Sequence, residues 1–103
     1  MANVMTTLDE ATARDLCDKY LAATQDCQCA LTTYSHETLG FWSFNWNSRE
    51  AVDSHGKQGY RRNLGPILVE KRTRIVTLLP FTPGGGWGLY CCEARLTREL
   101  AAA

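Results

Sequence analysis

Several features that would indicate a function directly are missing from this sequence of 103 residues. It has no apolar run near the length of about eighteen residues that a membrane-spanning helix needs, so we expect no membrane span. Eleven basic and eleven acidic side chains cancel, so the chain as a whole attracts neither nucleic acid nor an anionic membrane. Residues 1–16 lack the basic start and apolar stretch of a secretory signal, which indicates a cytoplasmic protein.

Motifs for metal binding and catalysis are also missing. The two histidines, His36 and His55, lie far apart in the sequence, and the five cysteines include C-x-C and C-C groups, which are not zinc-site spacings. These groups do not form a disulfide framework, so reduced thiols are the simpler interpretation. A thiol nucleophile at Cys91 or Cys92 beside either histidine stays an alternative, although no local motif supports it. The PGGGWG segment lacks the ending of a P-loop. We therefore expect no enzyme activity, no metal and no cofactor.

The sequence does contain the pattern of one α+β domain spanning residues 1–103. Thr7 and Glu10 have the spacing of a capping box, which predicts a helix over about residues 8–23. The apolar stripe of that helix is Ala13, Leu16, Cys17 and Tyr20. Strands are predicted near residues 27–34, 41–47, 66–71 and 74–81.

The end of the chain is ambiguous. Residues 87–92 fit either a fifth strand or the start of a helix, and the EARLTREL segment contains good helix formers. The expected fold is an N-terminal helix packed on a mainly antiparallel sheet of four to five strands, with a short C-terminal helix. The conformation of residues 80–103 stays open.

Aromatic residues alternate in the stretch GFWSFNWNSRE. Trp42, Phe44 and Trp46 share one face of a strand, where they are predicted to form the floor of the core beneath the helix. Their expected neighbours are Ile67, Val69, Ile75 and Leu78. Trp46 borders a polar segment, so partial exposure at the contact surface stays an alternative to burial for this residue. The other face of the strand, which contains Phe41, Ser43 and Asn45, is expected to be wetter.

The segment Ser48–Gly65 is polar, has three glycines and shows no period, which predicts a long loop with a short turn at Glu50–Asp53. Loops longer than about 12–15 residues in small domains are commonly functional. Tyrosine and arginine are favoured at interfaces. The candidate partner-binding residues are Trp46, Arg49, Tyr60, Arg61, Arg62 and Asn63. An ordinary solvated loop is the simplest interpretation of these basic residues, and a patch for an acidic protein partner is the next.

Two segments resemble one family. LGFWSFNWNSRE resembles the G-W-x-F-x-[WY]-x-S strand of the YrhB-like domain, also called the immunity protein 35 family. NLGPILVEKRT is similar to its G-N-x-P-[IL]-[IL]-V-[DE]-[KR]-x-T-G segment. The resemblance covers most of residues 8–79. It departs at Arg74, where the family has a turn glycine, and in the N-L-G-P order before the strand.

This resemblance implies a small bacterial protein that binds and neutralises a cognate toxin encoded beside it. Some members are instead discussed as chaperone-like, which makes a client-binding protein without a dedicated toxin the alternative. The expected partner is therefore a protein toxin rather than nucleic acid or a membrane. A homodimer formed through an unpaired sheet edge also stays open.

Overall fold

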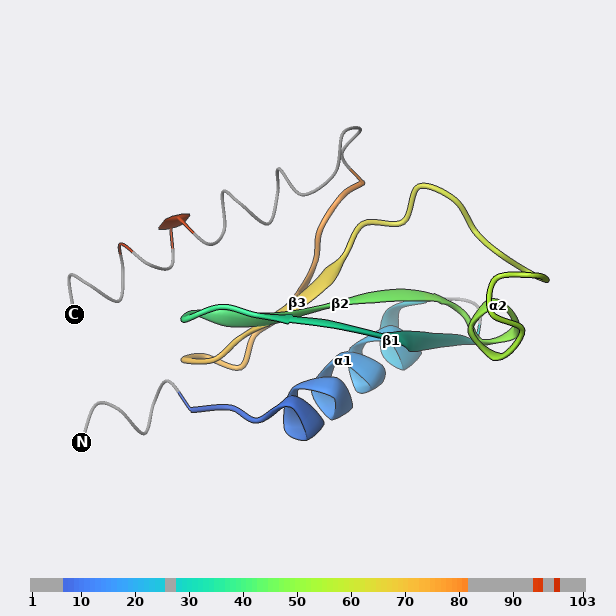
Figure 1. The fold of residues 1–103 in the computed structure, drawn as a ribbon. Helices are drawn as coiled ribbons and strands as arrows, with labels where there is room; N and C mark the ends of the chain where they lie inside the picture. The colour runs from blue at the N-terminus through green and yellow to red at the C-terminus, as the bar shows by residue number, and fades with distance from the viewer. Residues whose placement is uncertain (1–6, 26–27, 82–93, 96–97, 99–103) are drawn as a thin grey trace.

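An N-terminal helix and four antiparallel strands build the fold. In chain order the elements are α1 (Glu10–Thr24), β1 (Cys29–Glu37), β2 (Phe41–Ser48), α2 (Arg49–Asp53), β3 (Ile67–Glu70) and β4 (Val76–Leu78). The computed structural model describes residues 7–25, 28–81, 94, 95 and 98. The sheet has the order β1-β2-β3-β4, and α1 lies along one of its faces (Figure 1). The predicted α+β fold is therefore confirmed.

The N-terminal cap of α1 differs from the prediction. The helix begins at Glu10, and the cap is Asp9, whose Oδ1 accepts a hydrogen bond of 2.7 Å from the backbone N–H of Thr12. Glu10 is therefore the first helical residue and not the third, so the capping box predicted for Thr7 is wrong. The carboxylate of Glu10 pairs instead with Arg14, one helical turn later, at 2.9 Å.

Arg14 joins α1 to the sheet. Its guanidinium donates to the carbonyl oxygens of Thr32 and Thr33 at 2.9 and 3.1 Å, and lies 4.8 Å from the centroid of the Phe44 ring. These carbonyls belong to the part of β1 where the register with β2 shifts. Arg14 therefore satisfies two backbone acceptors in an irregular part of β1, which is an edge strand of the sheet.

The main core lies between α1 and the aromatic face of β2. Phe44 is fully buried and its ring is parallel to that of Trp42, with centroids 6.2 Å apart. Trp46 is only 6% exposed, so it belongs to the core and the alternative of partial exposure is wrong. The centre of this core is completed by five further side chains that are each at most 1% exposed: Ala13, Cys17, Leu21, Ile67 and Val69. Ile75, which was expected here, lies in the β3–β4 turn and is 56% exposed.

The opposite face of β2 is less exposed to solvent than predicted. Phe41 and Ser43 are fully buried, and only Asn45 is exposed as expected. Phe41 packs with buried Leu68 and partly buried Leu79 in a second, smaller cluster. An alternating strand shows which residues share a face, but it does not show whether a second layer covers the other face.

The connections follow the prediction in part. β1 continues to Glu37, so residues 35–37, which were expected in the hairpin connection, belong to the strand. The short turn predicted at Glu50–Asp53 is the helix α2, which begins one residue earlier at Arg49. The predicted β3–β4 hairpin is confirmed. The ambiguous residues 87–92 and most of the EARLTREL segment lie outside the described residues, although Ala94, Arg95 and Arg98 have helical conformation.

None of the helices in the described part of the chain is long and apolar enough to span a membrane.

Candidate functional site

The long segment between α2 and β3 crosses the side of the sheet opposite α1 (Figure 1). We call residues 54–65 the contact loop. The last residues of β2 hold it in place, because their side chains bond to its main chain. The side-chain amide of Asn47 does this twice, since its Oδ1 accepts from the N–H of Arg61 at 3.0 Å and its Nδ2 donates to the C=O of Arg61 at 3.1 Å. Asn47 is buried, so the amide side of both bonds is shielded from water.

The residues on either side of Asn47 bond to the same loop. Trp46 donates from its indole nitrogen to the carbonyl oxygen of Gly65 at 2.8 Å. Ser48 donates from its hydroxyl to the carbonyl oxygen of Gly59 at 2.7 Å. Three consecutive residues of β2 therefore fix three separate points of the contact loop.

Ser48 also begins α2. Its hydroxyl oxygen accepts from the backbone N–H of Ala51 at 3.1 Å, which makes Ser48 the N-cap of this short helix. The N–H of Arg49 donates to the C=O of Gln28 at 3.0 Å, which ties the start of α2 to the residue before β1. One serine thus directs the chain out of the sheet and holds the loop that returns to it.

Two residues of the contact loop adopt a left-handed backbone conformation without being glycine. His55, just after α2, has a φ of 55°, and Asn63 has a φ of 62°. The left-handed region costs most residues roughly 1–2 kcal/mol, although asparagine and histidine are enriched there. Both residues line the same cavity. Backbone strain of this kind often gathers at functional sites.

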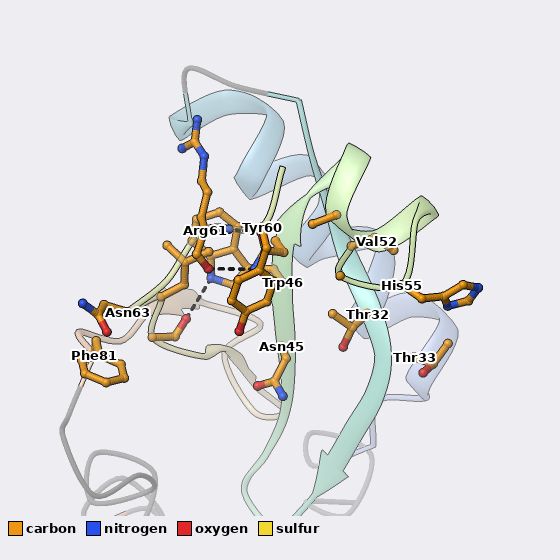
Figure 2. Close-up of a pocket in the computed structure, with 15 residues that line it drawn as sticks. Thr32, Thr33, Asn45, Trp46, Val52, His55, Tyr60, Arg61, Asn63 and Phe81 are labelled. Atoms are coloured by element: carbon orange, nitrogen blue, oxygen red, sulfur yellow. Dashed lines mark hydrogen bonds between the residues drawn. The ribbon is translucent and has the colours of Figure 1, made fainter. Parts of the chain in front are cut away.

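This cavity has a volume of about 520 Å³ and lies between the contact loop, α2 and the adjoining parts of β1 and β2. Its lining includes Thr32 and Thr33 of β1, Asn45 and Trp46 of β2, Val52 of α2, and His55, Tyr60, Arg61, Asn63 and Phe81 (Figure 2). No carboxylate contributes to the lining among the described residues. The surface is apolar with polar groups at intervals, which suits a protein side chain or a short segment of a partner.

The structure brings together only some of the six predicted site residues. Trp46, Tyr60, Arg61 and Asn63 line the cavity, and Tyr60 is 62% exposed. Trp46 forms the wall of the cavity and anchors the loop from a buried position.

The other two predicted residues lie outside the cavity. Arg62 is exposed and does not contribute to the lining, whereas Arg49 and Arg61 line a second hollow of about 630 Å³. Glu50 and Asp53 line that same hollow.

Sequence reasoning missed Asn45, Asn47 and His55. Asn45 and Asn47 alternate with the aromatic residues of β2, so the same period of two that identified the core face also places both asparagines on the other face. Polar amides on that face next to a long loop were the available signal. His55 and Phe81 come from segments without periodicity, and only the fold brings them to the cavity.

The described residues give little support to a catalytic thiol. Burial raises the pKa of the Cys17 thiol to about 12, with the carboxylate of Asp18 acting in the same direction, so Cys17 stays protonated near neutral pH. Cys27, Cys91 and Cys92 lie outside the described part. Among the described residues, no three His, Cys, Asp or Glu side chains gather in a way that could hold a metal ion.

Comparison with protein-family models, curated proteins and solved structures finds no match to this chain. Membership of the immunity protein 35 family therefore stays a prediction that rests on the two sequence segments.

Proposed function

We propose that the protein is an immunity protein that neutralises a cognate bacterial toxin by binding it stoichiometrically through the contact loop. The observation that carries this proposal is the attachment of the loop main chain to Trp46, Asn47 and Ser48. A loop held by its backbone keeps its outward side chains in one arrangement before binding. Pre-organisation of this kind reduces the conformational entropy that association costs.

The side chains that the loop presents suit a protein interface. Tyr60 and Arg62 are exposed at its surface. Tyrosine and arginine dominate binding hot spots because each provides a large contact area together with hydrogen-bonding groups. The cavity beside Tyr60 offers a place for one anchoring side chain of the partner.

The resemblance supplies the class of partner. One feature of the structure agrees with it at the point where the sequence departs. Arg74 occupies the position of the family's turn glycine, and its φ of 60° is the conformation that a glycine would readily adopt. A left-handed residue at this position suits the turn glycine that the resemblance places there, which supports the proposal.

The proposal is tested with the toxin domain encoded beside this gene. Co-expression of the chain should protect cells from that domain, and titration of purified chain should inhibit the toxin with an end point at one equivalent. The double variant Tyr60→Ala/Arg62→Ala should lose protection. The matched control Lys19→Ala, in an exposed position of α1, should retain it. A folded chain that gives no protection, or protection that Lys19→Ala also removes, would overturn the proposal.

Exposed apolar side chains at the other end of the sheet favour a second candidate, a chaperone-like protein. Leu39, in the β1–β2 turn, is 66% exposed, and Ile75 is 56% exposed. The two turns are joined because Lys71 N–H donates to Gly40 C=O at 2.9 Å. A chaperone function predicts that the native chain suppresses aggregation of unrelated clients and that Leu39→Ser/Ile75→Ser weakens this effect. No suppression by the native chain would exclude it.

A further inference from the structure

The balanced net charge conceals a strong asymmetry along the chain. Residues 1–53 contain eight acidic and three basic side chains, whereas residues 54–81 contain one acidic and six basic side chains. Half of those six basic residues lie in the contact loop, which contains no aspartate or glutamate. The loop is therefore a local positive region in a protein of zero net charge.

The fold separates these charges in space. Exposed Asp15 and Asp18 belong to α1, which lies on one side of the sheet, and the contact loop crosses the other side (Figure 1). A partner that approaches the loop therefore has the sheet between itself and the carboxylates of α1. An acidic partner would be attracted to the loop side and repelled by the α1 side.

The basic side chains of the contact loop also lack ion-pair partners among the described residues. Lys57, Arg61 and Arg62 are exposed, and none of them forms an ion pair with another described residue. Arg14 and Lys71, by contrast, are paired with Glu10 and Glu37 at 2.9 and 2.6 Å. Arg14 and Lys71 are thus occupied by carboxylates of the fold, whereas the three cations of the loop are available to a partner.

The carboxylates nearest to the loop do not cancel this charge at the cavity. Glu50 and Asp53 line the second hollow, together with Arg49 and Arg61, and neither lines the cavity beside Tyr60. Arg61 lines both hollows and therefore lies at the boundary between them. In Figure 2 its side chain extends away from Asn45.

From this arrangement we infer that the partner presents an acidic segment of its chain to the contact loop. The carboxylates of the segment lie near Lys57, Arg61 and Arg62, and one apolar side chain of the segment enters the cavity beside Tyr60. This inference rests on the proposed function and specifies the chemistry of the toxin surface that is bound. A peptide fits better than nucleic acid, because the cavity is apolar and the chain as a whole carries no net positive charge.

The test uses fluorescent peptides and the purified full chain. One probe is a phenylalanine flanked on each side by glutamates, the second replaces the glutamates with glutamines, and the third is a single-stranded oligothymidine. By fluorescence anisotropy at low ionic strength, the glutamate peptide should bind about tenfold more tightly than the glutamine peptide. This difference should shrink at high salt, because exposed charges are then screened.

Charge reversal locates the site. Arg62→Glu and Lys57→Glu should each weaken binding of the glutamate peptide severalfold. Arg72→Glu is the matched control, since Arg72 is an exposed arginine without an ion pair among the described residues and lies in the β3–β4 turn. Arg72→Glu should leave the affinity for the glutamate peptide within about twofold of that of the native chain.

Three results would overturn the inference. These are equal affinity for the two peptides, an equal loss in Arg72→Glu, or loop-dependent binding of the oligothymidine alone. Failure of the proposed function gives a different pattern, in which the glutamate peptide binds through the loop but the chain does not inhibit the toxin. If the chain inhibits the toxin stoichiometrically and neither Arg62→Glu nor Lys57→Glu weakens this inhibition, the proposed function stands. The inference that the toxin presents an acidic segment is then wrong.

Discussion

The side-chain amide of Asn47 bonds to both the N–H and the C=O of Arg61, at 3.0 and 3.1 Å. The two residues are fourteen positions apart in the sequence. An amide that pairs with both backbone groups of one residue imitates the pairing of a neighbouring strand. The contact loop therefore behaves as an extension of the sheet at this point, although its own backbone forms no strand there.

Gly65 is needed because the loop passes very close to the residue after β4. A Cβ at position 65 would overlap the carbonyl oxygen of Leu79, so the backbone itself would have to move. We expect Gly65→Ala to lower the free energy of unfolding by about 3 kcal/mol in urea denaturation. Gly56→Ala is the comparison, because that residue has a φ of 84° but nothing within 4 Å of an added Cβ. Gly56→Ala should lower the free energy of unfolding by only about 1 kcal/mol. Equal losses in the two variants would show that the close approach at Gly65 is absent.

Arg74 is expected to be a suboptimal residue in the β3–β4 turn. Its φ of 60° lies in the left-handed region that glycine adopts without strain. Arg74→Gly should therefore raise the free energy of unfolding, by up to about 1 kcal/mol. Arg72→Gly, two positions earlier and without a positive φ, should lower it. A loss of stability in Arg74→Gly measured by urea denaturation would contradict the turn geometry.

How far the sequence predicted this fold depends on how local each signal is. The alternation of Trp42, Phe44 and Trp46 placed all three on one face correctly, because the period of a strand is fixed by backbone geometry. The start of α1 was misplaced, since Thr7 and Asp9 are both good caps and the sequence does not show which one the chain uses. Burial of Phe41 depends on Leu68, which lies on another strand, and no local pattern reports it.

Some residues of the candidate site were likewise predictable from the sequence, and others were not. Tyr60 and Arg61 were predicted from residue type and from the unusual length of the loop, and both line the cavity. The role of Asn47 was not predicted, because the period of the strand shows which face the residue lies on but not which distant residue it binds. Trp46 was placed at the site for its position beside the loop, but its indole anchors the loop from within the core.

Ser43 presents a buried hydroxyl that lacks a hydrogen-bond partner among the described residues. A polar group buried in this way costs free energy, so its removal should be harmless. We expect Ser43→Ala to leave the free energy of unfolding unchanged or to raise it by up to about 1 kcal/mol. Ser48→Ala should lower it by about 1–2 kcal/mol, because that hydroxyl caps α2 and binds the loop. A clear loss in Ser43→Ala, measured by thermal denaturation, would reveal a bond to this hydroxyl.

The cap of α1 makes part of the stability depend on pH. The hydrogen bond from the Thr12 backbone N–H holds the pKa of the Asp9 carboxyl below its usual value of 3.8. Because the folded-state pKa is depressed, this contribution is present above pH 3.8 and is lost as the pH falls through the folded-state value.

Asp9→Asn separates the charge from the cap, since asparagine also caps helices but does not titrate. The stability of the native chain relative to Asp9→Asn should therefore be greatest above pH 3.8 and should decrease in more acidic solution. Circular dichroism of urea unfolding between neutral and acidic pH measures this difference. A difference that stays constant over this range would contradict the role of Asp9.

The central claim is that the contact loop is held in one conformation before any partner binds. Backbone ¹⁵N relaxation of the free protein tests it most directly, because order parameters report motion of each N–H on the picosecond to nanosecond timescale. We predict values of about 0.85 at Gly59, Tyr60 and Arg61, as in rigid backbone, and a fall below about 0.6 in Asn47→Ala. Values already below about 0.6 at these residues in the native chain would contradict the account.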